Sequence, residues 1–222
     1  MTITQTDKTV IIASITTFLT FLLNAKLGSI WLLYLNVLVV VGVFGYASRP
    51  WDPLSHLTRS AIFGVIASIT YVPLDWLFSR RVALLSYLSA GDIRIAAVPL
   101  SLLLTWMVVI TIIIYIYYRF NTIWERPYIP AVIVGSIAFV GSTIFDQFGS
   151  ARLWNWNAVR FPDFPYIGSV PVCVPIGLAL TFLLSPYYLR SHIVVGAIRC
   201  GLFIGIMQFL CFLSFYFVGI LR

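Results

Sequence analysis

At residues 145–157 the chain reads FDQFGSARLWNWN, directly after an apolar run that begins at Pro130. That run is long enough for a membrane-spanning helix, which needs roughly 20 apolar residues. Asp146 therefore falls at the end of a predicted span, and Arg152 follows it in the connection. Two tryptophans come next, and a Val170-Pro171 pair opens the following apolar run. The pattern predicts a carboxyl group just inside the membrane boundary, beside an aromatic connection.

The same pattern occurs earlier in the chain. Shifting the sequence by 71 positions aligns residues 59–81 with residues 130–152 without a gap. The polar identities carry most weight, because the chain has only seven acids; they are Asp75 with Asp146, Ser79 with Ser150, and Arg81 with Arg152. One inserted residue later, Ile95, Val98 and Pro99 align with Ile167, Val170 and Pro171. We interpret this as a tandem repeat of helix hairpins, at about 59–118 and 130–189.

Composition places the chain among integral membrane proteins. Of its residues 61% are hydrophobic and only 9% are charged, which is not the balance of a soluble domain. The formal net charge of +7 comes from arginines in short connections, where lipid headgroups explain them and nucleic acid does not. The expected partner is therefore a membrane lipid, and no nucleic acid partner is expected.

Seven segments are apolar and long enough to cross a bilayer. They cover about 10–25, 29–47, 60–79, 95–118, 130–148, 167–189 and 194–221. The predicted fold is an all-α membrane protein, a seven-transmembrane-helix bundle that forms one domain over residues 1–222. We expect a multi-pass protein of the cell membrane.

Two acids are the first candidates for chemistry. Two predicted spans separate the repeated segments, so the repeats run parallel and bring Asp75 and Asp146 to the same face. A carboxylate within the membrane is costly unless it is protonated, paired or next to a polar cavity. Two carboxyl groups that share a site help one of them to keep a proton that it can donate. The structural alternative is that each aspartate pairs with the arginine of its own repeat, Arg81 or Arg152.

Aromatic residues accompany both acids. The period of two in Trp154-Asn155-Trp156-Asn157 predicts an extended segment with both indoles on one side. Their faces could stabilise a carbocation through cation–π attraction, and so could three further rings, those of Trp76, Tyr87 and Trp106. The alternative for each ring is an aromatic belt at the membrane interface.

The sequence has no motif for a nucleotide site or a metal site. The chain has no Gly-x-Gly-x-x-Gly and no P-loop, so neither a dinucleotide nor ATP is indicated. His56 and His192 stand apart from any Cys/His or Glu-x-x-His cluster, so we expect no metal site and no cofactor. No Asp-x-x-Asp or Asp-x-x-x-Asp pair is present to hold magnesium on a diphosphate.

The order of motifs in this chain resembles that of the small integral-membrane carotenoid enzymes. An acid ends one span, Trp-x-Trp follows it, and Val-Pro opens the next span. The segment from Asp146 to Pro171 resembles the carotenoid 1,2-hydratase (bisanhydrobacterioruberin hydratase) family. The segment from Asp75 to Leu100 is similar to the membrane-embedded lycopene cyclase domains. Those cyclase domains follow their proline with a pair of glutamates, whereas this chain has Leu100-Ser101 and Val172-Cys173 after its prolines. The resemblance therefore implies hydration, or cyclisation of another isoprenoid.

The sequence thus predicts a cofactor-free enzyme that protonates an alkene or epoxide of an isoprenoid, a carotenoid or terpenoid, in the bilayer. Asp75 and Asp146 are the predicted catalytic residues, acting as general acid and its partner. The predicted substrate-binding residues are Trp76, Arg81, Tyr87, Trp106, Arg152, Trp154 and Trp156, with the two arginines setting the protonation of the acids. The alternatives are a non-catalytic carrier or transporter of a lipid or small solute, since parallel repeats also build transporters, and a purely structural membrane subunit.

Overall fold

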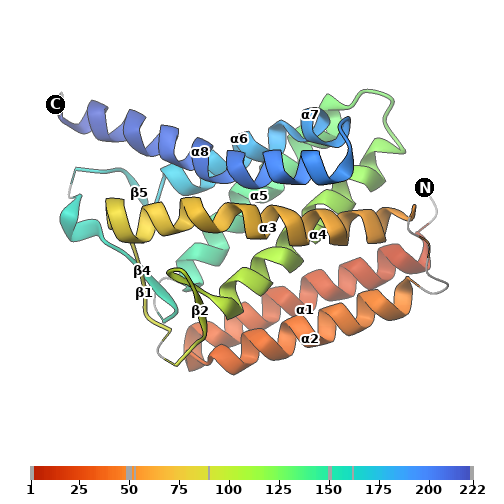
Figure 1. The fold of residues 1–222 in the computed structure, drawn as a ribbon, viewed down its shortest axis with the longest axis horizontal. Helices are drawn as coiled ribbons and strands as arrows, with labels where there is room; N and C mark the ends of the chain where they lie inside the picture. Colours follow the sequence, from red (N-terminus) through yellow and green to blue (C-terminus); the bar gives the residue numbers. More distant parts are fainter. Residues whose placement is uncertain are drawn as a thin grey trace.

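Long apolar helices make up most of the protein (Figure 1). The computed structural model describes residues 3–48, 52, 54–89, 91–149, 152–161 and 163–220. Its helices are α1 Gln5–Leu27, α2 Ile30–Ala47, α3 His56–Trp76, α4 Leu100–Asn121, α5 Tyr128–Gly149, α6 Cys173–Leu183, α7 Ser185–Leu189 and α8 Ile193–Ile220. Within these ranges six helices, all except α6 and α7, are long and apolar enough to cross a membrane. The protein is therefore a helical, multi-pass membrane protein.

The predicted span at 167–189 is not one long helix. It contains the 11-residue α6 and the five-residue α7, which meet at Leu184. A proline stands at the start of α7, where it has no backbone N–H to continue the hydrogen bonds of α6. The count of seven spans therefore stays a prediction.

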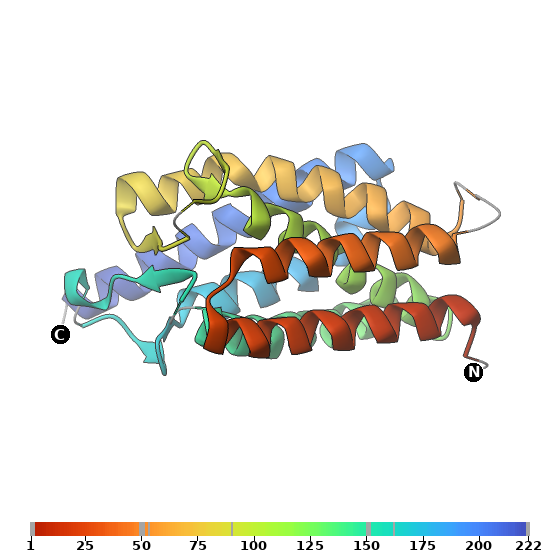
Figure 2. The same cartoon turned by 90° about the horizontal axis from the view of Figure 1, so that it is seen from below.

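The helices form one bundle around α3, α4 and α8. Helix α3 packs against both α4 and α8, and α6 packs against α5 and α8. Helices α1 and α2 lie side by side on one face of the bundle, and α1 also contacts α5 (Figure 2). Close packing depends on small residues: a Cβ at Gly201 of α8 would lie 2.3 Å from the Ala67 carbonyl oxygen of α3. Such small residues let helix backbones approach closely inside a membrane.

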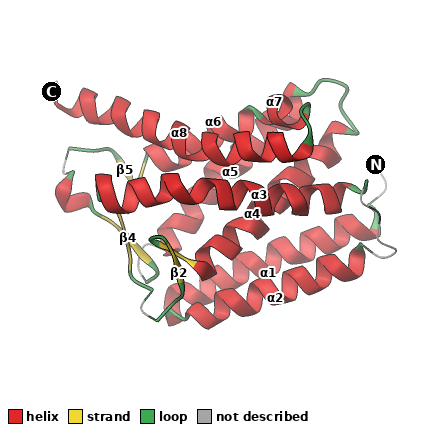
Figure 3. Ribbon diagram, in the orientation of Figure 1, coloured by secondary structure: helices red, strands yellow, loops and turns green. Residues whose placement is uncertain are grey.

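Short strands at one end of the bundle depart from the predicted all-α fold (Figure 3). They are β1 Leu85–Tyr87, β2 Arg94–Ile95, β3 Val98–Pro99, β4 Trp154–Trp156, β5 Tyr166–Ile167 and β6 Val170–Pro171. The expectation that helices begin at residues 95 and 167 was wrong, because both positions belong to tight antiparallel hairpins. Ile95 pairs with Val98, and Ile167 pairs with Val170.

Turn and proline chemistry explains these hairpins. The first turn residue has positive φ in both, Ala96 at 59° and Gly168 at 62°, as tight hairpin turns require. Pro99 then has extended backbone angles, so α4 begins only after it. The hairpins thus replace the first turns of the helices expected at both positions.

The most important strand pair joins the two halves of the chain. Strand β1 follows α3, strand β4 follows α5, and the two are antiparallel with Leu85 opposite Trp156 and Tyr87 opposite Trp154. The connection after Asp75 is therefore hydrogen-bonded to the connection after Asp146. This pairing holds the aromatic side chains of both connections at the same end of the bundle.

Candidate functional site

Asp75 and Asp146 line the same cavity, although they come from different helices. Their exposed fractions are only 2% and 6%, and the cavity has a volume of about 40 Å³. We name this cavity the carboxylate chamber; its other lining residues are Tyr71, Leu85, Tyr87, Leu102, Trp106, Phe145, Trp154, Trp156, Val174 and Gln208. The predicted pair thus meets in one largely aromatic site.

The local backbone structure around Asp75 positions its side chain at the chamber. It lies in the last turn of α3, two residues after Pro73, and the helix then widens into a π-helical segment at Leu77–Val82. π-helical turns are rare and frequently occur at functional sites. Ala83 ends this segment with a positive φ of 56°, and the chain then turns into β1. The backbone is therefore irregular directly after the first carboxyl group.

Tyr87 on β1 is a hydrogen-bond donor to Asp75. Its hydroxyl group donates to Asp75 Oδ2. Burial raises the pKa of the Tyr87 hydroxyl well above its ordinary value, and the nearby Asp75 adds to this. Tyr87 therefore stays protonated at any working pH and keeps its proton available for this bond.

The β4 tryptophans enter the chamber as the period-two pattern predicted. Trp154 and Trp156 are buried, while Asn155 between them is exposed. The Trp154 indole nitrogen is buried and has no hydrogen-bond partner among the described residues. The Trp154 ring also stacks on Phe145, with ring centroids 5.5 Å apart. The prediction of an extended segment with both indoles on one side is confirmed.

Three buried polar atoms of the chamber have no hydrogen-bond partner among the described residues. They are Asp75 Oδ1, Trp154 Nε1 and Trp156 Nε1. A water molecule needs at least about 10–15 Å³ and two to four polar partners. The chamber, at about 40 Å³, provides both the room and the partners. Two indole N–H donors and one carboxyl oxygen are thus suited to hold water beside the acids.

Three predicted site residues lie outside the chamber. Trp76 is 36% exposed, and the Arg81 guanidinium lies over its ring at 5.6 Å. Arg152 is exposed, and its side chain packs toward the turn at Gly28. Among the described residues the one ion pair joins Asp7 to Arg119. The structure therefore gives Arg81 and Arg152 no ion pair with the aspartates; Ser150, matched to Ser79 in the repeat, is outside the described residues.

The chamber also contains residues that the sequence analysis did not select. Gln208 reaches it from α8, and its Oε1 accepts a hydrogen bond of 3.2 Å from the Tyr71 hydroxyl. A buried amide within an apolar span is a recognisable signal, because polar groups inside a membrane are costly and tend to be functional. No group of three or more His, Cys, Asp or Glu residues in the described ranges is placed to hold a metal ion.

A comparison with protein families gives one match. Residues 72–219 match the family DUF6989, a domain of unknown function. The chain belongs to the DUF6989 family. Comparisons with curated proteins and with solved structures give no match. Both aspartates, Tyr87, the β4 tryptophans and Gln208 fall within the DUF6989 match, so this domain contains nearly the whole chamber.

The hydrogen bond from Tyr87 leads to a prediction about the stability of this DUF6989 protein. Tyr87→Phe removes the only partner of the Asp75 carboxyl group among the described residues. A buried polar group left without a partner costs about 1–3 kcal/mol, so we expect the free energy of unfolding in detergent to fall by that amount. Tyr46→Phe is the control, because Tyr46 is 75% exposed and should lose almost nothing. Equal stabilities of the two variants would contradict the prediction.

Proposed function

We propose that the protein is a membrane-embedded isoprenoid hydratase or cyclase that acts by protonating an alkene or epoxide. The observation that carries the proposal is the meeting of Asp75 and Asp146 in one chamber lined by aromatic rings. Paired carboxyl groups of this kind serve as proton donor and acceptor in acid–base catalysis. The substrate class, a carotenoid or terpenoid, comes from the family resemblance of the sequence.

One hydrogen bond supports different proposed roles for the two acids. Tyr87 already donates to Asp75, which stabilises the ionised form of Asp75, so in this proposal Asp75 is the proton acceptor and Asp146 is the donor. Asp146 in its protonated form gives its proton to a terminal alkene carbon, which leaves a cation on the neighbouring carbon. The π faces of Trp106, Trp154 and Trp156 stabilise that cation. Asp75 then accepts the proton that is released when the cation is quenched.

The polar atoms of the chamber favour hydration over cyclisation. The unpaired indole N–H groups and Asp75 Oδ1 support a water site in the chamber, and this water would attack the cation. The new C–O bond then forms while one water proton passes to Asp75, so the product gains one molecule of water. Transfer of this proton back to Asp146 restores the starting state.

We further propose that the fold is a tandem repeat that crosses the cell membrane seven times. The supporting observation is that Ile95, Val98 and Pro99 occupy the same register in the β2–β3 hairpin as Ile167, Val170 and Pro171 in the β5–β6 hairpin. Each hairpin follows an aspartate-bearing helix and precedes another apolar helix. For seven crossings, α6 and α7 together would have to act as the remaining span.

Product analysis tests the proposed function. The protein is expressed in cells that make lycopene or geranylgeranyl-derived lipids, and the lipid extract is analysed by mass spectrometry against cells with the empty vector. A product heavier by one water is the expected result and supports hydration. An isomer of unchanged mass supports cyclisation instead. If the protein changes the distribution of a lipid but forms no new product, it is the carrier of the alternative hypothesis. The enzyme proposal is then wrong.

A further inference from the structure

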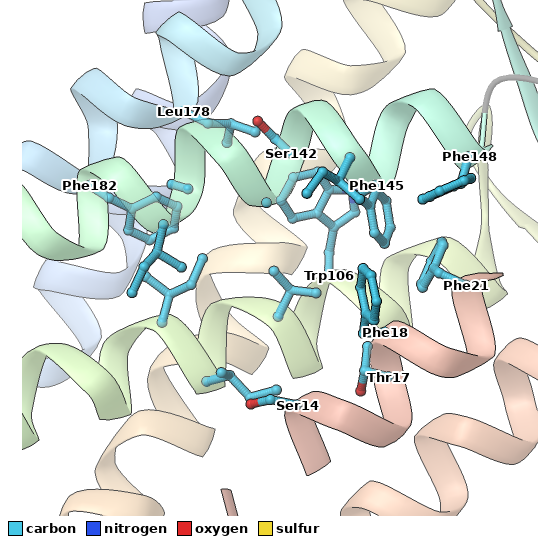
Figure 4. A pocket seen from close by; sticks show the side chains of 17 residues that line it. Ser14, Thr17, Phe18, Phe21, Trp106, Ser142, Phe145, Phe148, Leu178 and Phe182 are labelled. Atoms are coloured by element: carbon cyan, nitrogen blue, oxygen red, sulfur yellow. The ribbon is translucent and has the colours of Figure 1, made fainter. Parts of the chain in front are cut away.

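We infer that a groove between α1, α4 and α5 holds the apolar chain of the isoprenoid while its end reacts in the carboxylate chamber. This inference rests on the proposed function and specifies its substrate. The groove has a volume of about 240 Å³. Phe18 and Phe21 of α1, Trp106 of α4, and Phe145 and Phe148 of α5 project into it (Figure 4). We name it the apolar groove.

The lining of the apolar groove suits a hydrocarbon and no polar headgroup. No charged side chain is among its described lining residues, and its hydroxyl groups are already engaged within the protein. Ser14 Oγ donates to the Val10 carbonyl at 2.8 Å, and Ser142 Oγ donates to the Phe139 carbonyl at 3.2 Å. Thr17 Oγ1 accepts a hydrogen bond of 3.3 Å from Asn36. A phosphate or sugar headgroup would thus lose its hydration here without compensation.

Two aromatic residues connect the apolar groove to the carboxylate chamber. Trp106 and Phe145 line both cavities, and their ring centroids are 6.3 Å apart. The Phe145 ring also packs against Phe21 on the groove side, with ring centroids 3.8 Å apart, and against Trp154 on the chamber side, with ring centroids 5.5 Å apart. An apolar chain in the groove therefore ends beside the wall of the chamber. A rotation of these two side chains would let its end reach Asp146.

The apolar groove is also reachable from the bilayer. Phe18 of α1 is 47% exposed and Ile137 of α5 is 39% exposed, and both line it. These helices are long and apolar enough to cross the membrane, so these side chains face lipid. A substrate dissolved in the bilayer can enter sideways without passing through water.

The two volumes limit which substrates fit the two cavities. The chamber, at about 40 Å³, has room for a small terminal group and water but not for a long chain. The rest of the molecule must lie outside it, and the apolar groove shares its wall. The isoprenoid of the proposed function is therefore a long hydrocarbon whose reacting double bond is at an uncharged end.

One glycine allows the apolar groove to be filled without disturbing the helices. Gly141 of α5 lines it, and a Cβ added there meets no atom within 4 Å. Gly141→Leu therefore adds a side chain at the groove, and its Cβ contacts no other atom. Gly42→Leu in α2 is the matched control, because a Cβ at Gly42 also meets nothing within 4 Å and Gly42 lines neither cavity. Ile137→Trp is a second variant that narrows the groove from another position.

Photolabelling tests the inference independently of turnover. A geranylgeranyl hydrocarbon carrying a diazirine is irradiated with the full-length protein in nanodiscs, and labelled peptides are identified by mass spectrometry. We expect label on α1, α4 and α5, reduced about tenfold in Gly141→Leu and Ile137→Trp and unchanged in Gly42→Leu. Squalene, a linear isoprenoid hydrocarbon, should displace the label, and added phospholipid should not.

The outcomes separate this inference from the proposed function. Label that is unaffected by both groove variants, or that phospholipid displaces as well as squalene does, overturns the inference. Label that behaves as expected while wild-type protein forms no product from any isoprenoid supports the groove and overturns the enzyme. Product formation that persists in both groove variants supports the enzyme and overturns the groove as the substrate site.

Discussion

Asp146→Asn is expected to abolish formation of the isoprenoid product while the protein still folds and still takes up its lipid. The substitution keeps the size of the side chain but removes the proton that Asp146 donates to the alkene. A general acid contributes about 10²–10⁴-fold to a rate, so turnover should fall by at least the lower figure. Turnover of the Asp75→Asn variant should fall by a comparable factor, because the asparagine amide cannot take the proton released by water. The measurement is product mass per unit of folded protein.

Asp92 provides the control for this experiment. Its carboxyl group also accepts hydrogen bonds from hydroxyl groups, those of Tyr34 and Ser101, each at 2.5 Å, but it does not line the carboxylate chamber. Asp92→Asn should therefore lower stability and leave turnover per folded molecule unchanged. Full activity of both chamber variants would contradict the acid–base mechanism. A changed transport rate with no product in any variant would identify the carrier instead.

The residues that meet in the carboxylate chamber could be predicted further than the fold around them. Asp75 and Asp146 were predicted as a pair from their spacing in two similar segments and from the cost of a carboxylate in a membrane. The extended segment at Trp154–Trp156 was predicted from alternation over a few residues. Both inferences used patterns of residue type within short segments, and the structure keeps these segments in the predicted arrangement.

The parts that could not be predicted depend on contacts between distant segments. Nothing in Leu85–Tyr87 indicates a partner at Trp154–Trp156, because alternation can show that a segment is extended but does not show which distant segment it pairs with. Gln208 is more than 60 residues from Asp146 in the sequence, and only the packing of α8 brings it to the chamber. Arg81 and Arg152 were assigned to the site by their distance along the chain, but the π-helical segment and the turn after Gly149 direct them elsewhere.

Gly149→Ala is expected to displace Trp154 from the carboxylate chamber. A Cβ at Gly149 would lie 2.0 Å from Trp154 Cη2 and 2.1 Å from Cζ2, so the indole must move. Neighbouring side chains restrict this movement, because the Trp154 ring is buried and stacks on Phe145. Overpacking of this kind costs about 1–3 kcal/mol, and a misplaced site residue can cost roughly 100-fold in rate. We expect both losses, measured by unfolding in detergent and by product formation.

The cause of these losses can be tested with a double-mutant cycle. Trp154→Phe removes the outer ring atoms that the new methyl group would strike, so Gly149→Ala should cost less stability in that background. Gly42→Ala is the control, because a Cβ there meets nothing within 4 Å and alanine is favoured over glycine in a helix by about 1 kcal/mol. If Gly149→Ala costs the same with either ring at position 154, its effect comes from the helix end and not from the indole. In that case the glycine that ends the second aspartate-bearing helix has no part in holding the tryptophan beside the acid.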